Sequence, residues 1–318
     1  MLTLIHQAAA RLARPAVALL FAGLLPAWAH AAWPSQPITL VVGFPPGGSN
    51  DLIARIIAPR LGEELGVPVV VQNKPGANAA IGTAYTVNAK PDGYTITLGS
   101  TSVFSISPYT VPKLPYRPLT DLTAITTVAA STAVLAVNPG VPARTLDDLV
   151  ALARTRPVTL ASAGAGGISH LNIELLKAQT KANFMHVPYK GSSPATADVV
   201  GGQVDGIIMD YSALAGMIGQ GRLHALVASK PVGAITQSDM VIAAWYAVMA
   251  PAATPRDIVD RLHGALLKVA ADPGVRASLA KLDIDPMTQD SPEAAQAFIQ
   301  ADSERWSGVV KSAGLRFE

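Results

Sequence analysis

The chain has 318 residues, with 24 Lys and Arg against 22 Asp and Glu, so its formal net charge is only +2. It contains no cysteine, which excludes disulfides, thiolate metal sites and a cysteine nucleophile. No basic stripe stands out, so nucleic acid is not expected as a partner.

Residues 1–31 have the pattern of a cleavable secretory signal. Arg11 and Arg14 form a basic segment, residues 17–25 form an apolar core, and Ala29-His30-Ala31 matches a small-residue cleavage site. The apolar run is too short to favour a membrane anchor. Cleavage removes two arginines and no acid, which leaves 22 basic and 22 acidic residues. We therefore expect a mature, unanchored periplasmic protein that begins at Ala32.

Two stretches about 120 residues apart follow the same order of elements. The first has a strand at 38–42, a glycine loop and a helix from about Ser49; the second has a strand at 158–162, a glycine loop and a helix from about Ser169. Two further strands follow in each set, within residues 67–73 and 92–100, and within 183–188 and 204–212. Strands that alternate with helices predict parallel sheets built from βαβ units, and two such sets predict two α/β lobes.

The remaining segments connect and complete these lobes. Strand-like runs at 124–140, 223–229 and 243–251 are expected to cross between the lobes. Helices are predicted after Thr254, Asp272 and Ser291, because each of these capping residues is followed directly by a proline. We expect the C-terminal helices to pack against the first lobe.

The two glycine loops are the candidate binding elements. They are expected at the carboxyl ends of strands, where open α/β sheets bind ligands. Each loop leads into a helix N-terminus, which offers free N–H groups and a partial positive charge to an anion. Neither loop contains lysine or arginine. Recognition of a carboxylate is therefore expected to rest on N–H groups, hydroxyls and bridging waters.

Several of these residues have more than one interpretation. Ser49 caps its helix or touches ligand, and Asp51 is expected to hold the loop because its charge would repel a carboxylate. His170 has a structural or a binding role. Asp210 pairs with an ammonium group of the ligand or orders a loop, and Phe44 stacks on the ligand or fills the loop.

The chain resembles the Bug family of tripartite tricarboxylate transporter substrate-binding proteins (TctC-like). Eight stretches in family order carry the resemblance: WPSQPITLVVGFPPGGSND (33–51), VVVQNKPGANAAIGT (69–83), PDGYTITLG (91–99), LPYRPLTDLTAI (114–125), SAGAGGISHL (162–171), HVPYKGSSPA (186–195), DVVGGQVDGIIMD (198–210) and APAATP (250–255). The resemblance implies an α/β periplasmic-binding-protein type II fold, or Venus flytrap, with two lobes and a ligand cleft between them. It also implies a small carboxylate ligand and delivery to the permease subunits of a tripartite tricarboxylate-type transporter.

Two features depart from the family pattern. The segment KPVGAITQSDMVIAA (230–244) is shorter than its family counterpart, and Asn50 stands where the family has threonine. The implied lobes are residues 32–128 with 244–318, and residues 129–243, with hinges near Ala129 and Ala243. We expect a monomer without cofactor or metal. The predicted ligand-binding residues are Phe44, Gly47, Gly48, Ser49, Asn50, Asp51, Ser100, Thr101, Ser162, Ala163, Gly164, Ser169, His170 and Asp210.

Two other functions remain open from the sequence. A receptor of the same fold that signals through a periplasmic sensor would have the same ligand chemistry. A hydrolase-like enzyme is the weaker alternative, because the chain has no G-x-S-x-G nucleophile elbow and no cluster with metal-ligand spacing.

Overall fold

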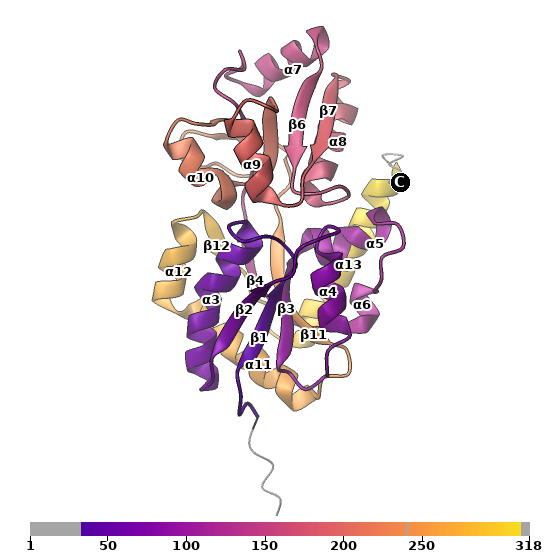
Figure 1. The fold of residues 1–318 in the computed structure, drawn as a ribbon, viewed down its shortest axis with the longest axis vertical. Helices are drawn as coiled ribbons and strands as arrows, with labels where there is room; N and C mark the ends of the chain where they lie inside the picture. The colour runs from indigo at the N-terminus through magenta and orange to yellow at the C-terminus, as the bar shows by residue number, and fades with distance from the viewer. Residues whose placement is uncertain (1–32, 240, 313–318) are drawn as a thin grey trace, which may run out of the picture. The chain divides into compact units, whose positions relative to one another are not determined.

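The computed structural model describes residues 33–239 and 241–312. The predicted signal peptide, residues 1–31, lies outside the described residues. From Gln36 onward the chain builds two six-stranded sheets, each with its own helices (Figure 1). The fold is the predicted α/β arrangement of two lobes.

The first lobe is built on a sheet with the strand order β12-β4-β11-β3-β1-β2. Its strands are β1 (Ile38–Val42), β2 (Val69–Asn73), β3 (Thr95–Ser100), β4 (Leu122–Ser131), β11 (Trp245–Pro251) and β12 (Ile284–Pro286). β1 pairs in parallel with β2 and β3. The core strands β1 and β11 are almost wholly buried, as their continuous apolar runs predict.

The second lobe repeats this plan in the order β10-β9-β5-β8-β6-β7. Its strands are β5 (Ala133–Val137), β6 (Val158–Ser162), β7 (Phe184–Pro188), β8 (Gly206–Asp210), β9 (His224–Ala228) and β10 (Thr236–Gln237). β6 pairs in parallel with β7 and β8, as β1 does with its neighbours in the first lobe. The internal repeat predicted from the sequence is therefore present in the fold.

The parallel pairing predicted for the βαβ units is present, but each sheet also contains antiparallel strands. β11 is antiparallel to β3 and β4, and β5 is antiparallel to β8 and β9. The parallel strands come from βαβ units within one lobe, whereas β5 and β11 enter their sheets directly after the chain has crossed from the other lobe. The crossings lie between β4 and β5, at residues 131–133, and between β10 and β11, at residues 237–245.

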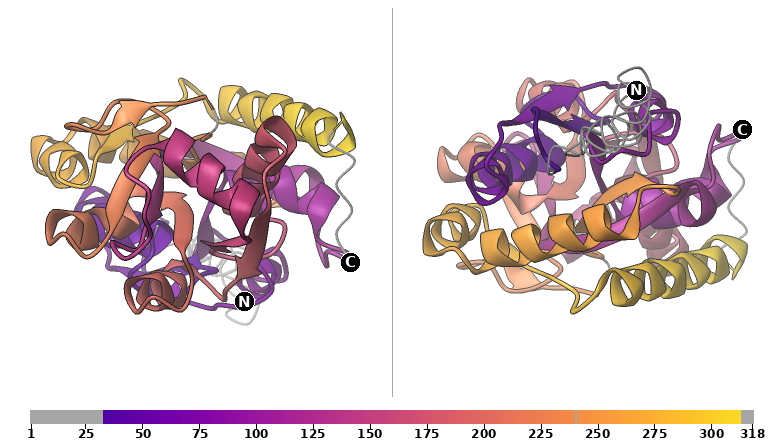
Figure 2. Two further views of the ribbon diagram at one scale, coloured as in Figure 1. Left: turned by 90° about the horizontal axis from the view of Figure 1, so that it is seen from above. Right: turned by 90° about the horizontal axis from the view of Figure 1, so that it is seen from below.

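Helices cover both sheets (Figures 1 and 2). The first lobe has α3 (Ser49–Leu65), α4 (Ala80–Val87), a π-helical turn η1 (Ser102–Ile106), α5 (Ser107–Thr110), α6 (Pro118–Asp121), α11 (Arg256–Ala271), α12 (Pro273–Ala280) and α13 (Pro292–Ser312). The second has α7 (Leu146–Thr155), α8 (Ile168–Thr180), α9 (Ser192–Val200) and α10 (Tyr211–Gly219). Among the described residues no helix is long and apolar enough to cross a membrane.

The predicted helix starts can be compared with the observed caps. The Asp272 carboxylate accepts from the N–H groups of Gly274 and Val275, and the Ser291 hydroxyl accepts from Ala294 N–H at 3.1 Å, so both caps are confirmed. The prediction for Thr254 is wrong. Pro255 holds the N-cap position of α11, and the Thr254 hydroxyl donates instead to the Pro251 carbonyl at 2.7 Å.

The C-terminal helices pack on the first lobe, as predicted, because α11 and α13 lie against β4. The long helix α13 also reaches the second lobe. Its Trp306 and Val310 share a buried apolar cluster with Ile106 of η1 and Leu171 of α8. Helix α13 therefore packs against both the first lobe and α8, the helix that follows the second glycine loop.

Candidate functional site

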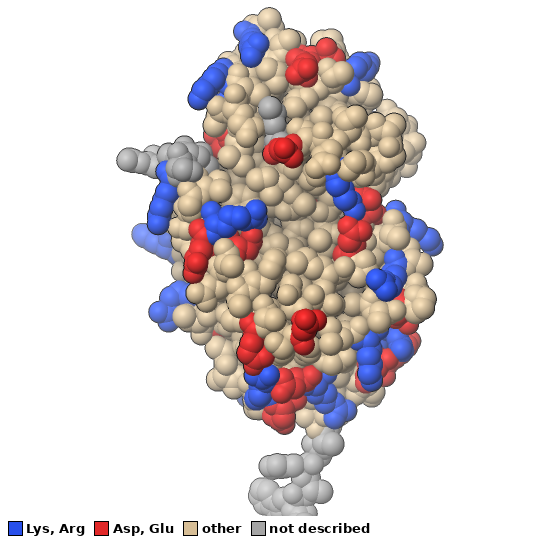
Figure 3. Space-filling view, turned by 180° about the vertical axis from the view of Figure 1, so that it is seen from behind, with Lys and Arg blue, Asp and Glu red and all other residues tan. Residues whose placement is uncertain are grey.

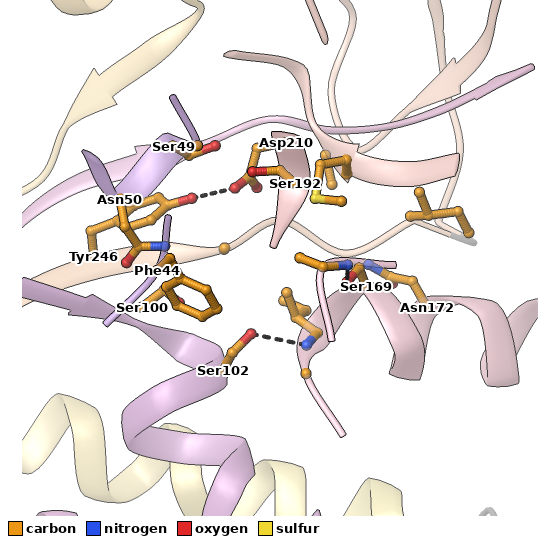
Figure 4. Close-up of a pocket in the computed structure, with 18 of the residues that line it drawn as sticks. Phe44, Ser49, Asn50, Ser100, Ser102, Ser169, Asn172, Ser192, Asp210 and Tyr246 are labelled. Carbon is orange, nitrogen blue, oxygen red and sulfur yellow. Dashed lines mark hydrogen bonds between the residues drawn. The ribbon is translucent and has the colours of Figure 1, made fainter. Parts of the chain in front are cut away.

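A cavity of about 50 Å³ lies between the two sheets (Figure 4). Both lobes line it: the first through the ends of β1 and β3 and the start of α3, the second through the starts of α8 and α9 and the end of β8. Eight of the predicted site residues line this cavity: Phe44, Gly48, Ser49, Asn50, Ser100, Ala163, Ser169 and Asp210.

Two helix N-termini point their first turns at the cavity. Gly48 is the N-cap of α3 and Gly167 the N-cap of α8, and neither makes a side-chain capping hydrogen bond. The first N–H groups of a helix have no acceptor within the helix, so they and the helix dipole favour an anion in front of them. Ser49 is thus the first residue of α3, and its predicted capping role is wrong. Its hydroxyl instead accepts from Ser212 at 2.9 Å.

Direct hydrogen bonds join the lobes around the cavity. The Ser102 hydroxyl of η1 accepts from the Ile168 N–H of α8 at 3.0 Å (Figure 4). The Thr110 hydroxyl donates to the Gly166 carbonyl at 2.6 Å. With the Ser49–Ser212 bond, these contacts describe lobes that are closed on one another.

Asp210 forms the acidic wall of the cavity. Its carboxylate accepts from the Ser131 hydroxyl at 2.7 Å and from the Tyr246 hydroxyl. Burial and the charge of Asp210 raise the pKa of Tyr246 well above its usual value, so the phenol stays protonated and donates. Of the two roles considered for Asp210, ordering of its surroundings is therefore present: it ties β4 and β11 to β8.

Asp51 holds the first glycine loop, as the sequence predicts. Its buried carboxylate accepts from Gly47 N–H and from Arg55, both at 2.9 Å. It also accepts from the Asn73 amide at 2.9 Å. Burial by itself would raise the pKa of this carboxyl, but these hydrogen bonds outweigh burial and lower it. Gly47 and Asp51 thus shape the loop from behind and do not line the cavity.

The second glycine loop is held by a pair of stacked histidines. The rings of His170 and His186 lie 3.6 Å apart at 13°, and His170 Nδ1 accepts from Gly166 N–H at 2.9 Å. His186 Nε2 lies 2.6 Å from the Ser162 hydroxyl, which also accepts from Gly164 N–H. The pair therefore fixes the backbone that leads to the start of α8.

The burial of His186 predicts a stability that falls in mild acid. Burial, followed by the charge of His170, lowers the pKa of His186 from 6.5 to about 4. The folded state keeps this ring neutral, whereas the unfolded chain takes up a proton, so its contribution is complete above about pH 6.5 and is lost as the pH falls toward 4. A His186→Gln variant should lose less stability than the wild type between about pH 7 and 4.5, as measured by urea unfolding. Equal losses in both proteins would contradict this role.

The remaining predicted residues lie beside the cavity. Thr101 is buried and its hydroxyl accepts from Trp245 N–H at 3.0 Å. Ser162 is fully buried behind the second loop. Gly164 and His170 line a neighbouring cavity of about 630 Å³, which shares Phe44 and Asn78 with the first.

The prediction missed several lining residues. Ser192 is the first residue of α9, and Tyr246 belongs to β11, which was predicted only as a strand that crosses between the lobes. Ala77, Asn78 and Ala79, which follow Gly76, are in left-handed conformations, with φ values of 47°, 51° and 72° in that order. Such a run is rare for residues other than glycine and is found at functional sites. The missed residues that bring polar side chains are Asn78, Ser102, Asn172, Ser192 and Tyr246.

Charge clusters and metal-ligand groups are the other features by which the described residues could form a site. On the face shown in Figure 3, basic and acidic side chains lie beside one another. Within the described residues no group of three or more His, Asp or Glu could hold a metal ion.

Comparison with known proteins identifies the family. Residues 53–315 match the tripartite tricarboxylate transporter family receptor, TctC. The chain belongs to the Bug/TctC family. It is 34% identical over 300 residues to protein BugT of Bordetella pertussis, a match that spans 90% of this chain and 92% of BugT. The predicted resemblance is thus confirmed, and this is a family of transporter receptors, that is, binding proteins and not enzymes.

Solved structures of similar proteins agree with the fold. A structure described as a periplasmic transporter is 34% identical, with a TM-score of 0.86, and the match covers 90% of this chain and 100% of that one. An R. palustris protein with adipate is 29% identical, with the same TM-score and the same coverage. The Bug/TctC chain described here therefore has the periplasmic-binding-protein fold of its relatives.

Proposed function

We propose that the protein is a periplasmic receptor that captures a small mono- or dicarboxylate between its lobes and delivers it to the membrane permease of a tripartite tricarboxylate-type transporter. The observation that carries this proposal is the cavity between the sheets, with the first turns of α3 and α8 facing it from opposite lobes. The adipate in a relative's structure supports a carboxylate ligand.

The site binds its anion without a full counter-charge. None of the described residues that line the cavity is a lysine or arginine. Backbone N–H groups and hydroxyls replace part of the hydration of a carboxylate, with waters bridging the rest. Such a site favours moderate affinity and rapid release, which suits a receptor that must give its ligand up.

The proposed mature protein is a monomer and begins at Ala32.

Closure of the lobes is the proposed conformational step. The proposed lobes are residues 32–128 with 244–318, and residues 129–243. The chain passes from one sheet to the other close to these limits, between β4 and β5 and between β10 and β11. In the closed state the lobes are joined by two hydrogen bonds: the Ser102 hydroxyl accepts from Ile168 N–H, and the Thr110 hydroxyl donates to the Gly166 carbonyl. A ligand that bridges the lobes adds contacts which exist only in that state, so it shifts the population toward closure.

A thermal-shift screen against a panel of carboxylates tests the proposed function. Ligand at about 100 times its dissociation constant adds roughly 2.7 kcal/mol to the free energy of unfolding. For a protein of this size the midpoint should rise by about 5 to 10 °C. A rise confined to a few acids supports the proposal. The absence of any rise across mono-, di- and tricarboxylates and amino acids would contradict it.

A further inference from the structure

The cavity has one acidic end. Asp210 is the single ionisable carboxylate among the described residues that line it, and no lysine or arginine lies among them. In Figure 4, Asp210 lies near Ser49 and Tyr246 on one side of the cavity, while Ser169 and Asn172 lie on the other side. The two hydrogen bonds that Asp210 accepts come from neutral hydroxyls, those of Ser131 and Tyr246. A half-buried carboxylate with only neutral donors gains from a cation placed beside it.

Asn50, which also lines this cavity, carries an unsatisfied acceptor. The side-chain oxygen Oδ1 of Asn50 is buried and has no hydrogen-bond partner among the described residues. A buried polar atom without a partner costs free energy unless a ligand or water supplies a donor. Asp210 and Asn50 thus offer acceptors, and an ammonium group carries three donors and no acceptor.

The opposite end offers donors. Ser169 lies in the first turn of α8, whose N–H groups have no acceptor within the helix. Because Asp210 would repel a carboxylate placed next to it, the ligand's carboxylate is favoured at the α8 end and disfavoured at the Asp210 end. The start of α3 also favours an anion, but the full negative charge of Asp210 outweighs the partial charge of a helix N-terminus. The cavity is therefore polarised, with an anion site at the α8 end and a cation site at the Asp210 end.

We propose that the ligand is an amino acid whose carboxylate faces the start of α8 and whose ammonium group is bound by Asp210, with Asn50 accepting a second hydrogen bond. This inference rests on the proposed function and narrows its ligand class. The volume of about 50 Å³ suits few non-hydrogen atoms, since one water takes up about 10–15 Å³ of such space. The neighbouring cavity of about 630 Å³, which shares Phe44 and Asn78 with this one, offers space for a larger ligand side chain.

Titration calorimetry with matched ligand pairs tests this inference. Each pair differs by one amino group: propionate and alanine, succinate and aspartate, glutarate and glutamate. In the wild type the amino member of at least one pair should bind about tenfold more tightly or better, the size expected for a charge-assisted hydrogen bond. An Asp210→Asn variant should lose this preference. The matched control is Asp198→Asn, which also removes a carboxylate that accepts from a tyrosine, at 2.6 Å from Tyr189, but does not line the cavity.

The outcomes separate this inference from the proposed function. Equal binding of both members of every pair, or a preference for the members without an amino group, would overturn the amino-acid inference and leave the carboxylate receptor standing. A preference that survives Asp210→Asn would overturn the role of Asp210. If none of the six acids binds, the amino-acid inference is overturned. If the thermal-shift screen of the wider carboxylate panel also shows no rise in the unfolding midpoint, the proposed function is overturned as well. The wild-type comparison decides the ligand class even where Asp210→Asn fails to fold.

Discussion

A Gly48→Asp variant is expected to lose ligand binding while it folds at least as stably as the wild type. A Cβ atom at Gly48 would lie 2.4 Å from the Ser192 hydroxyl of the other lobe, so a side chain here opposes closure. The added carboxylate would also occupy the start of α3, one of the two helix N-termini that line the cavity. We expect the dissociation constant to rise about 100-fold or more, which corresponds to roughly 2.7 kcal/mol.

The fold should tolerate this change for two reasons. Gly48 has φ −87° and ψ 168°, an extended conformation open to any residue. Aspartate is a preferred N-cap and its charge interacts favourably with the start of α3. Urea unfolding of the ligand-free protein and calorimetry with the best acid from the screen measure the two effects separately.

Two controls sharpen the Gly48 experiment. Thr145→Asp places the same residue at the N-cap of α7, away from the cavity, and should leave binding unchanged. Gly48→Ala adds the methyl group without the charge. Because a serine hydroxyl can rotate away, this variant should bind more weakly than wild type but better than Gly48→Asp. Binding by Gly48→Asp within about threefold of wild type would show that the α3 N-terminus does not receive the ligand.

A Trp306→Ala variant is expected to lower the free energy of unfolding by about 3–5 kcal/mol, the range found for large aromatic side chains removed from cores. Trp306 is 1% exposed and packs in the cluster that joins α13 to η1 and α8. Truncation would leave a cavity between the two lobes' helices, and close packing there allows little relaxation. The urea midpoint measures the loss.

Trp306→Phe is the matched control for that loss. The indole Nε1 of Trp306 is buried and has no hydrogen-bond partner among the described residues, so the exchange removes an unsatisfied donor while it keeps most of the apolar volume. Its cost should be well below that of alanine. Equal costs for the two variants would mean that the indole N–H matters and packing does not.

The sequence alone determined the local parts of this protein. The apolar runs of β1 and β6, followed by glycines and a helix, predicted both strand–loop–helix units, because strand burial and helix formation act over a few residues. Asp51 was correctly interpreted as a loop-holding residue, since a carboxylate in the first turn of a helix is favoured by the helix dipole. The eight family stretches extended these local patterns to a fold of two lobes.

The tertiary structure decided what meets across the lobes. Tyr246 lies 36 residues beyond Asp210, and only the crossing of β11 into the first sheet brings its hydroxyl to that carboxylate. Ser192 reaches Gly48 only in closed lobes, and His186 stacks on His170 only because β7 pairs with β6. No local pattern encodes these contacts, because they depend on how two separately formed sheets pack. The sequence thus determined the loops that can receive an anion, and the tertiary structure determined that an acidic wall stands opposite the start of α8.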